Sequence, residues 1–222
     1  MKEYINVFVV FCSMKKKKRS GFLRRVWYFI WEDDSVLSWL VNIVLAFILI
    51  RFVFYPLVGL VMGTSFPIVA VISSSMTHVN GDNWINNTAY CPSACTQEKW
   101  YSQKNISYAD FENFGFRTGF NKGDIIFVKG SDPYNIKIGD VIIFTADKSY
   151  PIIHRVVNKF EKNGKLYFET KGDNNPGQIV DPQLNEKLVS ADSILGVGFG
   201  RLPYFGYLKI FISDIFGSIL GR

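Results

Sequence analysis

The residues with the clearest chemical potential are three consecutive serines that end an apolar run. Residues 69–72 are apolar and mostly β-branched, which is typical of a buried strand, and Ser73–Met76 follow directly. A strand that ends near Ser75 would hold this hydroxyl rigidly and leave it open to a substrate. Because a serine hydroxyl is a weak nucleophile until a neighbouring base takes its proton, Ser75 needs a partner elsewhere in the chain.

The chain has two histidines that could be this base. His78 follows Ser75 closely and would reach it only through local folding. His154 lies inside an apolar strand pattern, where an ordinary strand histidine is the simpler interpretation. Asp173 and Asp181 lie in a later loop, and a carboxylate there could fix the tautomer of an imidazole and stabilise its charged form. Because such triads are defined by geometry, order along the chain does not decide between these groups.

The composition is that of a chain that lies partly in lipid. Its 222 residues are 48% apolar and 16% aromatic, enough for one domain with an anchor or for two small domains. The net charge of +6 is concentrated in Lys15–Arg19, Arg24 and Arg25, just before a long apolar segment. A basic cluster in that place indicates the cytoplasmic flank of a membrane span rather than a nucleic-acid site, so no nucleic-acid partner is expected.

The apolar segment is predicted to be a transmembrane anchor over residues 35–62, with Ser35 as the helix N-cap. Residues 1–34 would be a cytoplasmic basic and aromatic segment, so the chain would cross the cell membrane once with its N-terminus inside. Arg51 is expected to snorkel toward the outer interface, and Pro56 to kink or end the helix.

Residues 66–203 are predicted to form a mainly β, compact and curled extracytoplasmic domain. Within it, residues 77–120 lack periodicity and are expected to be a functional or flexible insert. The insert carries two glycosylation sequons, Asn86-Asn87-Thr88 and Asn105-Ile106-Ser107, which fit an outward-facing segment. Strands are expected at 123–129, 138–144, 151–157, 166–170 and 194–199, with an Asn163-Gly164 hairpin turn.

Three smaller features leave alternatives open. Met14, followed by the lysines, is expected to be an alternative start. Cys91 and Cys95 would form a local bridge or remain two free thiols, and they are a weak zinc signal without a nearby histidine, so no metal is expected. Residues 204–222 favour an amphipathic helix in the membrane interface over a second span, because charged residues interrupt them.

Four motifs in order resemble the conserved boxes of type I signal peptidases. His154-Arg155-Val156 is similar to the archaeal and endoplasmic-reticulum branch, whereas bacterial relatives have Lys where His154 stands. The resemblance covers roughly residues 36–205 without the insert. The four motifs are Ser73-Ser74-Ser75-Met76, Gly139-Asp140-Val141-Ile142, His154-Arg155-Val156 and Lys171-Gly172-Asp173-Asn174-Asn175.

The resemblance implies a role for each matching residue. Ser75, just before Met76, would be the nucleophile and His154 its general base. Ser73 would join the Ser75 backbone N–H in the oxyanion hole, and Ser73 and Met76 would belong to the oxyanion and substrate-binding part of the site. An acidic residue in the following loop would complete the arrangement.

Two departures from the family's pattern concern the serines and this acid. The family usually has Gly where this chain has Ser74, so a torsion that requires Gly is not essential here. The family also has a second Asp about six residues after Asp173, where this chain has Ile179. Asp181, a little further on, is the expected triad partner, with Asp173 in a supporting role.

The expected function is therefore that of a membrane-bound serine endopeptidase without a cofactor. It would remove signal peptides from secretory preproteins after small residues, in contact with membrane lipid and in association with the export machinery. A related protease of narrow range, gated by the insert, is one alternative. A non-catalytic, membrane-anchored β domain that binds peptides or partner proteins is the other.

Overall fold

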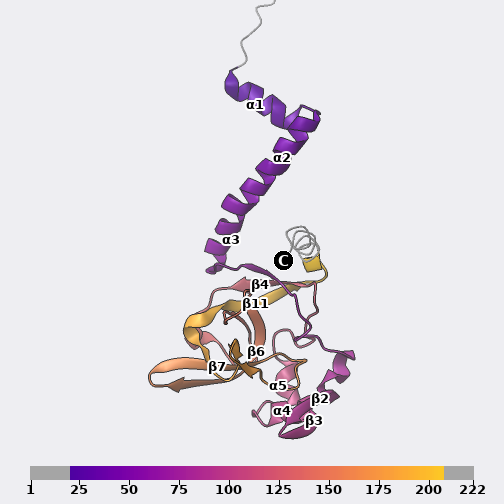
Figure 1. Ribbon diagram of the computed structural model, residues 1–222, viewed down its shortest axis with the longest axis vertical. Helices are drawn as coiled ribbons and strands as arrows, with labels where there is room; N and C mark the ends of the chain where they lie inside the picture. Colours follow the sequence, from indigo (N-terminus) through magenta and orange to yellow (C-terminus); the bar gives the residue numbers. More distant parts are fainter. Residues whose placement is uncertain (1–20, 208–222) are drawn as a thin grey trace, which may run out of the picture. The chain divides into compact units, whose positions relative to one another are not determined.

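The computed structural model describes residues 21–207 (Figure 1). The basic cluster at Lys15–Arg19, the alternative start at Met14 and most of the predicted helix 204–222 lie outside the described residues. The chain divides into two compact units, Met1–Val53 and Phe54–Arg222. The boundary falls inside the apolar helix and not at its end.

The first unit contains α1 (Phe22–Trp31) and α2 (Val36–Leu49). Ser35 is the N-cap of α2, as expected, because its hydroxyl accepts a hydrogen bond from the Ser38 N–H at 3.2 Å. The Ser38 hydroxyl in turn donates to the Phe29 carbonyl at 2.5 Å, and the Asn42 amide donates to the Ile30 carbonyl at 2.9 Å. Polar side chains of α2 therefore satisfy carbonyls at the end of α1 that have no partner within their own helix.

The apolar helix Val36–Met62 is long and apolar enough to cross a membrane. It continues from α2 through a π-helical turn, η1 (Ile50–Phe54), into α3 (Tyr55–Met62). Pro56 therefore does not end the helix: it lies in the first turn of α3, where its missing N–H is tolerated. The helix ends at Gly63, which adopts the left-handed conformation with φ 66°. Apolar side chains are exposed along its whole length, as expected for a helix that associates with lipid rather than water.

The second unit is built on a curled antiparallel sheet of seven strands (Figure 1), in the order β1-β4-β11-β5-β6-β7-β10. This confirms the predicted mainly β fold. Asn163 and Gly164 form the predicted hairpin turn between β6 and β7, and both have positive φ, at 54° and 72°. The strands are β1 (Ile68–Ala70), β4 (Ile125–Lys129), β5 (Val141–Phe144), β6 (Ile152–Lys162), β7 (Lys165–Lys171), β10 (Val189–Ser190) and β11 (Ile194–Leu202).

Apolar side chains fill both faces of this sheet. Ile142 and Phe144 of β5 pack with Val156 of β6 in one cluster, whereas Val141 and Ile143 face the other. All of β5 is buried, so its continuous apolar run reflects burial on two sides. At the β1 end of the strand order, β1 pairs only with β4 among the described residues, and its second edge has no partner strand there.

The insert 77–120 is a compact subdomain and not an open loop. Its core is aromatic, with Trp84, Trp100, Tyr101 and Phe111 buried together. Cys91 and Cys95 form a disulfide across its small hairpin, which decides between the bridge and the two free thiols. The elements are η2 (Gly81–Asn86), β2 (Thr88–Cys91), β3 (Ser93–Thr96), α4 (Gln97–Ser102) and α5 (Tyr108–Glu112).

Short elements complete the second unit, and two of them form a hairpin in the loop between β7 and β10. The turns η3 (Pro133–Asn135) and η4 (Ala191–Ser193) precede β5 and β11. Between β7 and β10 the chain forms a two-stranded hairpin, β8 (Val180–Asp181) with β9 (Leu184–Asn185). This hairpin brings Ile179, just before β8, beside Glu186, just after β9.

Candidate active site

Ser75 lies in a turn just beyond β1. The Lys171–Asn175 segment packs against this turn and is hydrogen-bonded to it. The Asn174 N–H donates to the Ser75 carbonyl at 2.8 Å, and the Asn174 side-chain amide donates to the Ser74 carbonyl at 3.2 Å. Ser74 is exposed and has no positive φ, so the backbone here accepts a side chain where the resemblance expects Gly. The serine turn and the segment that follows β7 thus form one hydrogen-bonded unit.

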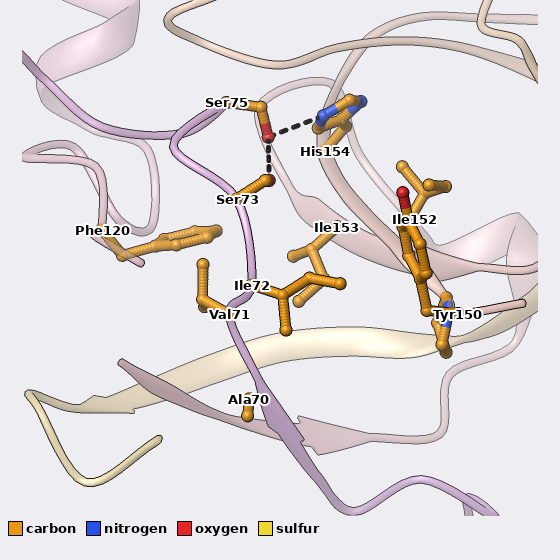
Figure 2. A pocket seen from close by; sticks show the side chains of 11 residues that line it. Ala70, Val71, Ile72, Ser73, Ser75, Phe120, Tyr150, Ile152, Ile153 and His154 are labelled. Carbon is orange, nitrogen blue, oxygen red and sulfur yellow. Dashed lines mark hydrogen bonds between the residues drawn. The ribbon is translucent and has the colours of Figure 1, made fainter. Parts of the chain in front are cut away.

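The structure brings Ser75 and His154 together from distant parts of the chain. The Ser75 Oγ lies 2.9 Å from the His154 Nε2 (Figure 2). His154 belongs to the buried part of β6, where it pairs with Ile142 of β5, and only 4% of its surface is exposed. A rigid central strand therefore carries the imidazole, so the simpler interpretation of an ordinary strand histidine does not explain its position against a serine.

The other nitrogen of His154 faces a carboxylate that the sequence did not single out. His154 Nδ1 lies 2.5 Å from Glu186 Oε1, and Glu186 is completely buried. A carboxylate can only accept a hydrogen bond here, so this contact assigns the proton to Nδ1. In the neutral ring Nε2 is then the acceptor, and the Ser75 hydroxyl donates to it. This is the tautomer that a general base for Ser75 requires.

Asp181 does not lie at His154, contrary to the predicted pairing. Its Oδ1 accepts hydrogen bonds from the Gln183 and Leu184 N–H groups, both at 2.8 Å, and closes the turn of the β8–β9 hairpin. The residue is exposed. The physical reason is local: an aspartate readily bonds backbone N–H groups a few residues ahead, and here that turn takes up the carboxylate.

Asp173 is the centre of a buried polar cluster beside the site. Its carboxylate accepts hydrogen bonds from Arg155 Nε at 2.9 Å and Nη2 at 2.8 Å, and from the Tyr101 hydroxyl at 2.9 Å. His78 Nε2 lies 3.0 Å from the same carboxylate, and its ring stacks on Trp84. Burial alone would raise the pKa of Asp173, but the Arg155 charge and these hydrogen bonds hold that pKa well below its usual range.

This cluster settles two candidates by position. His78 is turned toward Asp173 and not toward Ser75, so His154 is the histidine that the structure places against the serine. Asp173 makes none of the described contacts with His154, and its carboxylate instead joins the insert to β6. Its backbone N–H approaches the Met76 sulfur at 3.4 Å. The expected supporting role is therefore one of holding the chain around the serine turn.

Lys171 and Gly172, which precede Asp173 in the same motif, also have structural roles beside the site. Lys171 Nζ donates to the Gln97 amide oxygen of the insert at 2.8 Å and to the Gly172 carbonyl at 3.0 Å. Burial lowers the pKa of Lys171 to about 7. A Cβ on Gly172 would lie only 2.9 Å from both His154 Nε2 and the Ser75 carbonyl oxygen. Only glycine leaves room for the serine and the imidazole to meet there.

Ser73 and Met76, the two remaining predicted site residues, have different surroundings. Ser73 Oγ lies 3.1 Å from Ser75 Oγ, so its hydroxyl is beside the candidate nucleophile. Met76 is 1% exposed and belongs to the apolar cluster beneath the turn, away from the pocket surface. Met76 therefore anchors the turn in the core.

A small pocket adjoins the Ser75–His154 pair, with a volume of about 50 Å³ (Figure 2). One wall is the chain from Ala70 to Ser73, which continues the open edge of β1, and the opposite wall is the start of β6. Phe120, from the end of the insert, also lines it. The full lining is Ala70, Val71, Ile72, Ser73, Ser75, Phe120, Tyr150, Pro151, Ile152, Ile153 and His154.

Glu186 is the site residue that sequence reasoning missed. The only signal for it was its place among the carboxylates between β7 and β11, where Asp181 stands nearer to the family's spacing from Asp173. As for metals, residues 21–207 contain no group of three or more His, Cys, Asp or Glu side chains that could hold an ion.

A serine hydroxyl beside an imidazole, itself backed by a buried carboxylate, is the arrangement of groups found in serine hydrolases. The chain is similar to the signal peptidase complex catalytic subunit SEC11 of Eremothecium gossypii, with 39% identity over 99 residues. The corresponding subunits of Lachancea thermotolerans and Saccharomyces cerevisiae are 37% and 34% identical over 100 and 99 residues. The resemblance to signal peptidases is thereby confirmed.

These matches are partial. Each covers 43% of this chain, and the chain spans about 59% of the length of the curated relatives it matches. No family model matches the chain.

Proposed function

We propose that this chain is a membrane-bound serine endopeptidase that removes N-terminal signal peptides from exported preproteins after small residues. The observation that carries the proposal is the 2.9 Å contact between Ser75 Oγ and His154 Nε2 at the rim of a small pocket. The similarity to catalytic subunits of signal peptidase complexes supports the choice of substrate.

In the proposed reaction, Ser75 Oγ attacks the scissile carbonyl carbon while its proton passes to His154 Nε2. The new C–O bond forms as the carbonyl π bond opens, which places negative charge on the carbonyl oxygen. When this tetrahedral species collapses, His154 gives the proton to the leaving amine and an acyl-enzyme remains. A water molecule, deprotonated by the same imidazole, then releases the signal peptide and restores Ser75.

The developing oxyanion needs donors, and two lie close to the reacting oxygen. We assign this role to the Ser75 backbone N–H and the Ser73 hydroxyl, which lies 3.1 Å from Ser75 Oγ. Each such donor is worth about 2.7–4 kcal/mol in the transition state. Met76 lies in the core, and we assign it no contact with the substrate.

The pocket and the open strand edge support a substrate with small side chains in an extended conformation. An extended peptide could add to the free edge of β1 by backbone hydrogen bonding and run past Ile72 toward Ser75. The small size of this pocket, about 50 Å³, supports the expectation of a small side chain before the cut. This combination favours the segment between a signal peptide and the mature protein.

We place the reaction at a membrane, with residues 1–34 cytoplasmic, the anchor at 35–62, the catalytic domain at 66–203 on the opposite side and residues 204–222 against the lipid. The likeness to the endoplasmic-reticulum branch and the fungal relatives favour the endoplasmic-reticulum membrane over the cell membrane. Because these relatives are named as subunits of a complex, we infer that this chain also works with partner subunits.

The test is cleavage of a secretory preprotein by the full chain in liposomes, compared between Ser75→Ala and Ser74→Ala. Ser75→Ala is expected to abolish processing, because no other hydroxyl in the described residues has the same contact with His154. Ser74 is exposed and makes no side-chain hydrogen bond in the described structure, so Ser74→Ala is the matched control and should remain active. Processing by Ser75→Ala at the wild-type rate would refute the proposal.

A related protease of narrow substrate range is the second candidate, because Phe120 of the insert lines the pocket. Cleavage of several preproteins that differ in the residues before the cut separates the two: a general processing enzyme cleaves most of them, and a narrow one cleaves few. Labelling of Ser75 by a serine-reactive probe excludes the non-catalytic β domain.

A further inference from the structure

Glu186 is the only acidic side chain that the described structure places against His154, and neither predicted aspartate reaches it. We propose that Glu186 is the positioning residue of the site: it holds His154 with Nδ1 protonated and replaces the aspartate that the resemblance expects where this chain has Ile179. This inference rests on the proposed function, because it concerns the base that activates Ser75.

The chain brings Glu186 to the place of the missing aspartate through direct contacts with Ile179. The Ile179 N–H donates to Glu186 Oε2 at 2.6 Å, and the Glu186 N–H donates to the Ile179 carbonyl at 2.9 Å. The β8–β9 hairpin lies between the two residues and closes this pairing. A longer acidic side chain, from the far side of a hairpin, thus occupies the position that a shorter one would fill from residue 179.

The carboxylate of Glu186 is fixed on both oxygens. Oε1 accepts from His154 Nδ1 and, at 3.3 Å, from the Thr170 hydroxyl of β7, while Oε2 accepts from Ile179. The Glu186 backbone carbonyl also accepts from the Thr170 N–H at 2.8 Å. These bonds leave the carboxylate one orientation, so the imidazole plane and the direction of Nε2 toward Ser75 are also fixed.

Burial makes this carboxylate effective during proton transfer. Glu186 is completely buried and His154 is 4% exposed, so little water screens the interaction between them. When His154 takes the proton of Ser75, the carboxylate beside Nδ1 stabilises the imidazolium. In contrast, the Asp173 carboxylate is engaged by Arg155 at 2.8 Å and is not available for this role.

The kinetic test compares Glu186→Gln and Glu186→Asp in the preprotein assay, with Asp181→Asn as the matched control. Glutamine keeps the shape but offers an amide that no longer selects the Nδ1–H tautomer, so kcat should fall by about 10³–10⁴-fold with KM nearly unchanged. Glu186→Asp keeps the charge and should recover a large part of this loss. Asp181→Asn removes a charge that closes only a surface turn and should keep wild-type turnover.

A second measurement reads the tautomer directly and does not depend on turnover. The chain has only two histidines, so ¹⁵N-histidine NMR of the full chain in detergent gives a simple spectrum. Wild-type His154 should show a protonated Nδ1 and an unprotonated Nε2, and Glu186→Gln should lose this preference.

The outcomes separate this inference from the function on which it rests. If Ser75→Ala is inactive but Glu186→Gln keeps wild-type kcat, or if the His154 tautomer is the same in both proteins, the role of Glu186 is refuted and the proposed function stands. The role of Glu186 is also refuted if Asp181→Asn loses as much turnover as Glu186→Gln. Cleavage by Ser75→Ala would refute the proposed function itself.

Discussion

Among single residues, Ser75 Oγ has two polar neighbours with different roles. With His154 Nδ1 protonated, as proposed, the Ser75 proton points to His154 Nε2 at 2.9 Å, and the Ser73 hydroxyl would then donate to Ser75 Oγ at 3.1 Å. A donor that already points at the nucleophile needs only a small movement to reach an oxyanion that forms beside it. Ser73 can therefore act in the transition state without being part of the proton relay.

Replacement of Ser73 by alanine should lower kcat by about 10²–10³-fold and leave KM nearly unchanged, because the lost bond strengthens only as the oxyanion forms. Single-turnover cleavage of a preprotein in liposomes measures this. Ser74→Ala, one residue further along the same turn, is the control and should behave as wild type. A Ser73→Ala protein with wild-type kcat would leave the backbone N–H as the sole donor.

At the level of elements, the buried Arg155–Asp173 ion pair is the centre of one set of contacts that join the insert to the sheet. Arg155 uses its guanidinium on the Asp173 carboxylate and on the carbonyls of Gly115, Phe116 and Gly139, at 2.8–3.0 Å. The cluster thus connects β6, the segment after β7 and the insert. Because the same segment holds the serine turn, the insert and the site share their support.

Asp173→Asn should therefore destabilise the second unit by about 3–5 kcal/mol, because it leaves the buried Arg155 charge without its carboxylate. Urea unfolding followed by tryptophan fluorescence measures this, since Trp84 and Trp100 lie in the insert. Asp181→Asn removes the same charge from an exposed turn and should change stability far less. Equal stability of the two variants would show that the cluster does not hold the insert.

The same pair predicts how stability depends on pH. Because the pKa of Asp173 is lower in the folded state than in the unfolded state, its contribution is complete above the ordinary aspartate value of about 3.9. It is lost as the pH falls below this value and through the lower pKa of the folded state. Asp173→Asn should therefore weaken the wild-type loss of stability in this acid range, which urea unfolding at a series of pH values measures.

The elements that follow simple periodic patterns could be predicted from the sequence. β4, β5, β6, β7 and β11 all lie where alternating or continuous apolar runs indicated strands, and the Asn163-Gly164 turn follows from its dipeptide. The structure of the insert was harder to predict, because it depends on aromatic packing and on buried polar contacts between residues far apart, such as Tyr101 with Asp173. Neither kind of contact produces a periodic pattern of apolar residues in the sequence.

The residues of the proposed site also divide into those that the sequence could predict and one that it could not. The ordered motifs led to Ser75 and His154, because each motif carries its chemistry in adjacent residues. The acid could not be placed by spacing: Glu186 reaches His154 through the β8–β9 hairpin and its pairing with Ile179. Asp181 is nearer to the family's spacing, but local turn hydrogen bonds take its carboxylate.

For the whole molecule, the order of segments along the chain predicts on which side of the membrane the proposed site lies. The basic cluster Lys15–Arg19 precedes the apolar helix Val36–Met62, and every residue of the proposed site follows it. Positive charges before a span favour its cytoplasmic end, so the site would lie on the other side of the membrane. That side is where a signal peptide leaves the bilayer, and there the proposed peptidase would meet its substrate.

The sequons of the insert make this orientation testable. Asn86 and Asn105 are both exposed, and each lies in an acceptor sequence that is modified only on the non-cytoplasmic side. If the second unit faces the lumen of the endoplasmic reticulum, the chain expressed in eukaryotic cells should carry glycans that an endoglycosidase removes. Asn86→Gln and Asn105→Gln should each remove one glycan, and the double variant should remove both.

Lys18→Asn is the matched control, because it creates an acceptor sequence with Arg19 and Ser20 on the other side of the span. Made in the double variant, this sequence should stay unmodified if residues 1–34 are cytoplasmic. Modification at residue 18, with Asn86 and Asn105 unmodified in the parent chain, would reverse the orientation. The second unit would then lie in the cytoplasm, where Ser75 and His154 could not meet a signal peptide as it leaves the membrane.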